Sequence, residues 1–230
     1  MNGRRILTVA SIAVLALVLA PAVLADGNAN GITGSPHDFS NEGWNFRGEI
    51  CRTCHVPHDH GRDTGLVGLL WNHALPDTTG YVMYSSSSLD GAADAEPTGI
   101  SKMCLGCHDG TVALDEFDSN VGTPGTTFIG AGDQVPNLPG SPQDLRATHP
   151  ISIVYDNAAD LELNDPATTQ MGASGKPISA FLENGKVQCH SCHDVHDSPT
   201  EAVAGTHLLR VGQTNSTGSP SGLCLTCHNK

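Results

Sequence analysis

Apolar residues are concentrated near the start of this 230-residue chain and become sparse after it. One long apolar run covers Ile6 to Ala20, and a five-residue strand-like run follows much later, at Ile151 to Tyr155. Elsewhere Gly, Pro, Ser, Thr and Asn interrupt the apolar stretches, most of all between Asp118 and Pro150. Because regular elements need longer periodic runs, the pattern predicts mostly irregular coil with short helices and very little strand.

The N-terminal run has the features of a secretory signal peptide. Arg4 and Arg5 precede it, and Val23-Leu24-Ala25 forms a cleavage-like sequence before Asp26. We therefore expect residues 1–25 to be a signal peptide and residues 26–230 to be the mature domain. A transmembrane anchor is the alternative, but the run is short for a bilayer span and ends in Pro21. The expected location is extracellular or at the cell surface, alternatively periplasmic, with no membrane span in the mature chain.

The composition leaves little material for an ordinary hydrophobic core. The chain has five Phe, two Trp and three Tyr, which is few for a mature protein of about 205 residues. Without Arg4 and Arg5, nine Lys and Arg face 24 Asp and Glu, a formal charge of −15. Such an acidic surface keeps an exported protein in solution and excludes nucleic acid as a partner.

All eight cysteines fall in four Cys-x-x-Cys-His motifs, the attachment pattern of c-type haem. On a helical turn these positions share a face, so two thiols can bond the porphyrin edge while the imidazole reaches the iron. The sequence thus predicts four covalently bound haem c groups that form the core of the protein, and short helical turns at the motifs. The motifs are Cys51-Cys54-His55, Cys104-Cys107-His108, Cys189-Cys192-His193 and Cys224-Cys227-His228.

Zinc knuckles and a disulfide framework are the alternatives for these cysteines. Zinc sites also use paired Cys and His, but zinc does not require a histidine directly after each second cysteine. Disulfides within the motifs would close four very small loops, which constrain an unfolded chain far less than long cross-links do. Both alternatives fit the spacing less well than haem.

The sixth position on each iron decides between electron transfer and substrate chemistry. Beyond the four proximal ligands the chain has eight further histidines, enough to close every iron, and imidazole is a good iron ligand. The mature chain has three methionines, Met83, Met103 and Met171, fewer than the haems. We therefore expect bis-histidine coordination throughout.

The chain also shows a loose internal repeat of two di-haem halves, about residues 26–117 and 148–230. The first runs Cys-x-x-Cys-His-Val-Pro-His, then Leu-Leu-Trp-Asn-His, then a second motif at Cys104. The later half runs Cys-x-x-Cys-His-Asp-Val-His, then His-Leu-Leu-Arg, then a motif at Cys224. This plan predicts one continuous haem row and not two freely moving domains.

Flanking segments give a more specific resemblance. They are His37-Asp38-Phe39-Ser40, Cys-His-Val-Pro-His ending at His58, Leu70-Trp71-Asn72-His73, Cys104 to Asp115, His149-Pro150-Ile151-Ser152, and Leu223 to Lys230. The chain resembles the extracellular filament-forming tetrahaem c-type cytochromes of the OmcE type over nearly its whole mature length.

The resemblance implies stacked bis-histidine haems, a head-to-tail homopolymer, and one distal histidine donated across the subunit interface. Carried over by position, it indicates five distal candidates, one more than needed, with His58 or His37 as the cross-subunit donor. The candidates are His37, His58, His73, His149 and His196.

Three functions are weighed against these features. The first is electron transfer through four haems in the repeating subunit of an extracellular filament, or nanowire, passing electrons to redox proteins or extracellular acceptors. A monomeric periplasmic tetrahaem carrier is the alternative. A multihaem reductase needs an open iron position for its substrate. The surplus of histidines argues against such a position, so we expect no enzyme activity and no catalytic residues.

Overall fold

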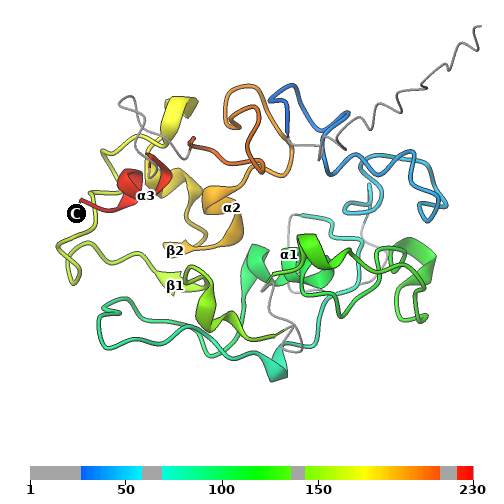
Figure 1. Cartoon of the computed structure of the whole chain (residues 1–230), viewed down its shortest axis with the longest axis horizontal. Coiled ribbons are helices and arrows are strands. Elements are labelled where there is room, and N and C mark those ends of the chain that lie inside the picture. The colour runs from blue at the N-terminus through cyan, green and yellow to red at the C-terminus, as the bar shows by residue number, and fades with distance from the viewer. Residues whose placement is uncertain (1–26, 59–68, 136–142, 213–221, 230) are drawn as a thin grey trace, which may run out of the picture.

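A computed structural model describes residues 27–58, 69–135, 143–212 and 222–229 of the protein (Figure 1). The expected signal peptide, its cleavage point and His60 lie outside these residues. Within them most positions are in turns, bends or coil, with a few short helices and very little strand. The predicted coil-rich fold class is thereby confirmed. In this part of the chain no helix is long and apolar enough to cross a membrane.

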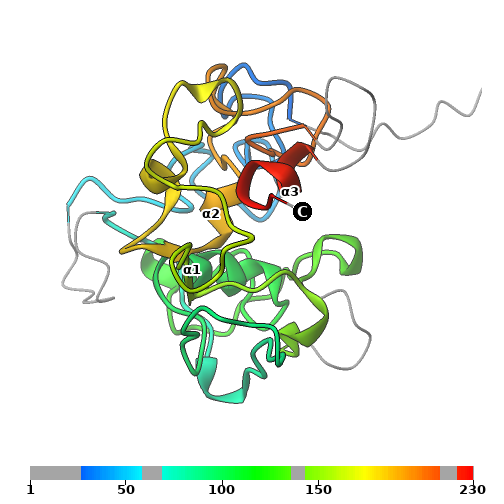
Figure 2. The same ribbon diagram turned by 90° about the vertical axis from the view of Figure 1, so that its left-hand side faces the viewer.

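Three short α-helices of the described residues coincide with Cys-x-x-Cys-His motifs. They are α1 at Gly99–His108, α2 at Cys189–Cys192 and α3 at Gly222–Cys227. Figure 1 shows α3, α2 and α1 following one another across the molecule, and Figure 2 gives the view along that direction. Six single-turn 3₁₀ helices complete the helical content of the described part of the chain, namely η1 Thr78–Gly80, η2 Asp118–Asn120, η3 Ala131–Asp133, η4 Leu145–Ala147, η5 Gly172–Ser174 and η6 Ile178–Phe181.

Helix α1 is capped by a residue from a distant part of the chain. Thr98 at its N-cap makes no side-chain capping bond, and the amide of Ile100 instead donates to Oε2 of Glu183 at 2.8 Å. A side chain at Gly99 would collide with this carboxylate, and the φ of Gly99 is +53°, which favours glycine. The helix carrying the second motif is therefore fixed against the segment that leads to the third.

A two-stranded antiparallel sheet joins the same regions. Strand β1, Ile153–Val154, pairs with β2, Lys186–Val187, with Ile153 opposite Val187. The strand is shorter than the predicted run from Ile151 to Tyr155 because Ser152 has a φ of +56° and turns the chain. The Ser152 hydroxyl donates to Gln188 and accepts from the amide of Thr98, so Ser152 links the segment before α1 to the segment before α2.

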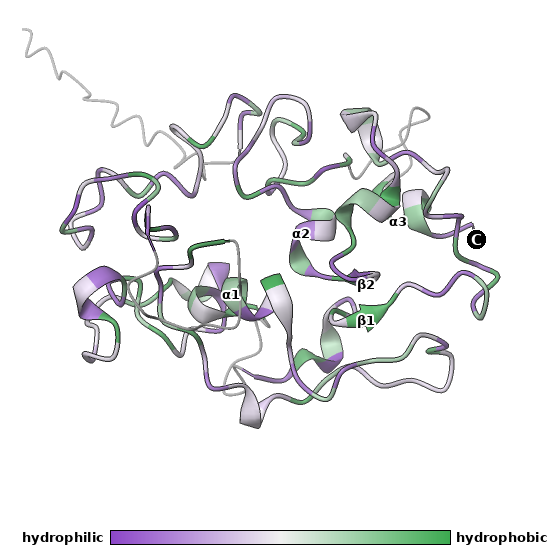
Figure 3. Cartoon of the chain, turned by 180° about the vertical axis from the view of Figure 1, so that it is seen from behind, coloured by the Kyte–Doolittle hydropathy of each residue, from purple (hydrophilic) through white to green (hydrophobic). Residues whose placement is uncertain are grey.

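The buried apolar residues of the described chain include two small clusters, and others, such as Phe117, lie outside them. One contains Tyr155, Met171, Ile178 and Phe181, and the other contains Tyr81, Leu105 and Leu145. Figure 3 shows apolar residues scattered along the ribbon without a continuous layer. The polypeptide thus has the thin, loop-rich character expected from its composition.

Candidate metal centre

Each Cys-x-x-Cys-His motif adopts a helical turn, as the spacing predicts. The second lies inside α1. In the other three the amide of the histidine donates to the carbonyl of the first cysteine, and these bonds are His55 to Cys51 at 2.8 Å, His193 to Cys189 at 3.0 Å and His228 to Cys224 at 2.8 Å. The turn brings both thiols and the imidazole to one face, which is the arrangement that thioether attachment and iron ligation require.

Three motif histidines are oriented through one ring nitrogen. In each, Nδ1 lies within hydrogen-bonding distance of a backbone carbonyl, namely that of Leu69 for His55 at 2.7 Å, of Asp133 for His108 at 2.8 Å, and of His207 for His193 at 2.8 Å. A metal-bound histidine commonly donates its second nitrogen in this way, because the bond fixes the tautomer and the ring direction. The contact at Nδ1 leaves Nε2 available as a metal ligand.

The motifs lie next to one another in chain order. Burial, and then the nearby Cys54, raise the pKa of the Cys107 thiol. A hydrogen bond to Cys189, and then burial, raise the pKa of Cys104. Burial, and then the nearby Cys227, raise the pKa of Cys192 to about 11. Each motif therefore has a cysteine close to one in the next motif.

The two ends of this row are open. Cys51 in the first motif and Cys224 in the last are exposed, whereas the other six cysteines are partly buried. Within the row, α1 and α2 are in contact, and the amide of Cys189 donates to the Ser101 hydroxyl at 3.0 Å.

Three proximal histidines face a second histidine ring from a distant part of the chain. An iron held between two imidazoles, with metal–nitrogen bonds of about 2 Å, would separate the ring centroids by roughly 6 Å. The observed pairs are His37 with His108 at 6.0 Å, His55 with His196 at 6.3 Å, and His149 with His228 at 6.4 Å between centroids. The spacing suits two axial ligands of one iron.

Burial, followed by the neighbouring His108, lowers the pKa of His37 to about 4. The ring is therefore neutral at physiological pH, which is the form that binds a metal.

The remaining two distal candidates are placed differently. His73 is buried, with its Nδ1 at 3.0 Å from the carbonyl of Ala74 and its Nε2 at 3.3 Å from that of Leu114. His58 is exposed and contacts no described residue through its ring. Among the described residues, His193 is the proximal histidine without a facing second ring. The structure thus brings His37, His149 and His196 to motif histidines and leaves His58 free at the surface.

The described parts of the loops after the first and third motifs have the same local structure. The amide of Val56 donates to the carbonyl of Leu70 at 2.9 Å, and that of Asp194 donates to the carbonyl of Leu208 at 2.7 Å. Both leucines have positive φ, +49° for Leu70 and +57° for Leu208. The proximal Nδ1 contacts span 14 residues in each loop. In this alignment His58 corresponds to His196, and His73 corresponds to Val211.

The described residues fit haem iron better than a bare metal ion. In this part of the chain no group of three or more His, Cys, Asp or Glu converges as a zinc shell would require. Facing pairs of imidazoles suit an iron whose other four ligands come from a porphyrin.

Buried polar atoms without partners also occur at the motifs, at Oγ1 of Thr53, Nε1 of Trp71 and Nδ1 of His190. Such orphaned groups are uncommon in native proteins and are typically destabilising by about 1–3 kcal/mol each. A haem carries propionate oxygens that can accept from such donors.

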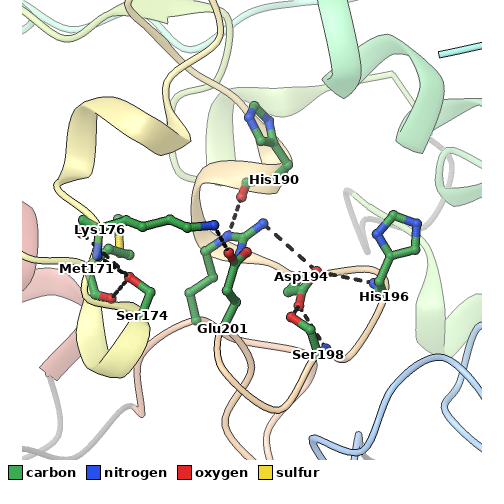
Figure 4. Close-up of polar contacts among 9 residues, drawn as sticks. Met171, Ser174, Lys176, His190, Asp194, His196, Ser198 and Glu201 are labelled. Atoms are coloured by element: carbon green, nitrogen blue, oxygen red, sulfur yellow. Dashed lines mark hydrogen bonds and ion pairs between the residues drawn. The ribbon is translucent and has the colours of Figure 1, made fainter. Parts of the chain in front are cut away.

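A buried ionic network supports the third motif (Figure 4). The guanidinium of Arg210 donates from Nε to the carbonyl of His190 at 2.8 Å and from Nη1 to Glu201 at 2.6 Å. It lies 4.4 Å from the ring centroid of Phe181, and its Nη2 is 4.0 Å from Asp194. The sequence analysis assigned no role to Arg210. Its place directly after Leu208-Leu209, in a chain with few basic residues, was the available signal.

Comparison with known proteins adds no assignment, since no protein-family model matches the chain and no curated protein matches it.

Proposed function

We propose that the protein is an electron-transfer subunit with four covalently attached haem c groups, each closed by two histidines, and that it assembles head to tail into an extracellular filament. The observation that carries the proposal is the set of three facing histidine pairs at about 6 Å on three of the four motifs. Bound haem supplies reversible one-electron chemistry at iron. The chain supplies attachment, both axial ligands and close spacing of the motifs.

The internal repeat supports one particular cross-subunit ligand. His196, just after the third motif, faces His55 of the first motif. Its counterpart His58, just after the first motif, is exposed. If the halves of successive subunits meet as the halves within one chain do, His58 of one copy reaches the iron of His193 in the copy before it. This assignment leaves His73 as the spare candidate.

Such a contact produces an open filament. The donor and the acceptor are different surfaces of the same chain, so the interface is head to tail and repeats without closing unless the rotation forms a ring. The exposed Cys51 and Cys224 at the ends of the row favour transfer between haems of neighbouring subunits. Filled axial positions favour conduction over substrate binding, which argues against an enzyme.

The test replaces the exposed ligand while leaving the fold intact. We expect His58→Ala to retain four attached haems and to remain monomeric, with one haem in four high-spin and able to bind carbon monoxide. His58→Met is the matched variant, because a thioether can also bind iron and raises its potential. It should restore assembly, with one haem at a higher midpoint potential.

Mixing experiments give a second readout. A His58→Ala subunit can still accept a ligand at its His193 iron but cannot donate one, so small amounts should cap one end of wild-type filaments and shorten them. Electron microscopy measures the lengths. Normal filaments with only low-spin haem from His58→Ala would exclude His58 as the cross-subunit ligand, and monomers alone from the wild type would favour a soluble carrier.

A further inference from the structure

The first described residues of the chain are tied to its second half. The segment Gly27–Gly31, here called the N-terminal strap, lies beside the loop 194–210 (Figures 1 and 2). The amide of Gly205 donates to the carbonyl of Gly27 at 2.8 Å, and the amide of Gly31 donates to the carbonyl of Asp197 at 2.7 Å. Two parts of the chain about 170 residues apart in sequence therefore form one unit.

Asp197 is the centre of this contact. It is fully buried, and its carboxylate accepts from the amides of Asn28 at 2.8 Å and Ala29 at 2.9 Å. A buried carboxylate is strongly destabilising unless hydrogen-bond donors compensate it, and charge-assisted bonds to amides are among the stronger ones. The fit is tight, because a side chain at Gly27 would collide with Leu208 and with Asp197 itself.

The residue before Asp197 is an expected iron ligand. His196 lies with its ring 6.3 Å from that of His55, at an interplanar angle of 22°. Its loop is held on one side by Asp194, whose Oδ1 accepts from the amide of His196 at 3.3 Å, and on the other by the strap. Asp197 has a φ of +49°, in the left-handed region that aspartate tolerates, and so forms the turn that directly follows His196. Releasing the strap would let this turn relax and carry His196 with it.

We propose that Asp197 is a positioning residue that uses the N-terminal strap to hold His196 on the iron bound by His55. The inference rests on the proposed haem function. It goes beyond that function because it gives the N-terminal strap a role in the axial ligation of the haem at the first motif. Axial closure at the first motif then depends on the contact between the N-terminal strap and the loop 194–210.

The experiment measures carbon monoxide binding by the reduced holoprotein and low-spin and high-spin signals in the oxidised one. Asp197→Ala should open one haem in four. Asp197→Asn keeps one oxygen acceptor and should largely restore the low-spin state. Asp156→Ala is the matched control, since this partly exposed carboxylate also accepts from two amides, those of Ala158 at 3.1 Å and Ala159 at 3.0 Å, and should leave all haems low-spin.

A double variant separates positioning from general damage. Because Asp197 acts through His196, His196→Ala combined with Asp197→Ala should bind no more carbon monoxide than His196→Ala alone. More than one open haem in the double variant, or no open haem in Asp197→Ala, would overturn the inference. Open haems already present in the assembled wild type would instead contradict the proposed bis-histidine function, so the two failures are distinguishable.

Discussion

Removing the buried cation at Arg210 should destabilise the protein by about 3 kcal/mol, within the range of about 3–5 kcal/mol measured when one partner of a buried ion pair is removed. In Arg210→Leu the side chain can still pack on Phe181, but the bonds to Glu201 and to the carbonyl of His190 are lost. The side chains of Arg210 and Asp194 are 7% and 6% exposed, so water cannot solvate the Asp194 carboxylate once the guanidinium is gone. Lys176 still pairs with Glu201, which places the estimate at the low end of the range.

Guanidinium unfolding of the holoprotein, followed by circular dichroism in the haem Soret band, measures the change in free energy. The matched control is Arg146→Leu. Arg146 forms an ion pair with Asp144, but its side chain is 64% exposed, and we expect little change in the unfolding midpoint, because exposed ion pairs contribute little to stability. Equal unfolding midpoints for the two variants would refute the assignment of Arg210 as the support of the third motif.

Three further predictions each concern a single residue. The hydrogen bond from Lys176, and then the one from Arg210, hold the pKa of Glu201 below its usual range, although burial acts to raise it. A carboxyl group whose pKa is lower in the folded than in the unfolded protein stabilises the fold above its unfolded pKa, and this contribution is lost as pH falls. The difference in unfolding free energy between wild type and Arg210→Leu should therefore shrink below about pH 4, measured by unfolding at pH 7 and pH 3. Gly99→Ala should lower stability by roughly 1–2 kcal/mol through its positive φ and the carboxylate that its side chain would meet, whereas Gly132→Ala, which has open space, should be nearly neutral in the same assay. His73→Ala should leave every iron low-spin in electron paramagnetic resonance, because its ring contacts backbone carbonyls and not a facing histidine.

Local features of this fold could be predicted from the sequence. The helical turns at the motifs follow from the Cys-x-x-Cys-His spacing itself, since each is closed within five residues, as Cys51 to His55 shows. The coil-rich backbone follows from the sparse apolar runs. The strand at Ile153–Val154 was overestimated in length because the turn at Ser152 depends on contacts with Thr98 and Gln188, which no local pattern encodes.

The pairing of distant residues could not be predicted. The histidine pairs join residues 71, 141 and 79 positions apart, as His37 with His108, His55 with His196 and His149 with His228. Sequence supplied five candidates but no rule for matching them. The contact of Asp197 with the N-terminal strap was missed because its donors are backbone amides, which have no sequence signature. The correspondence of His58 with His196 follows from the repeated Cys-x-x-Cys-His-x-x-His pattern, but the different surroundings of the two rings became visible only in the structure.

Electron paramagnetic resonance of the oxidised, assembled holoprotein tests the central claim most directly, with spins counted against the protein concentration. The account predicts four low-spin ferric haems per chain and no high-spin signal, since every iron would be held between two imidazoles. A high-spin signal in the assembled wild-type protein, or fewer than four haems per chain, would contradict it.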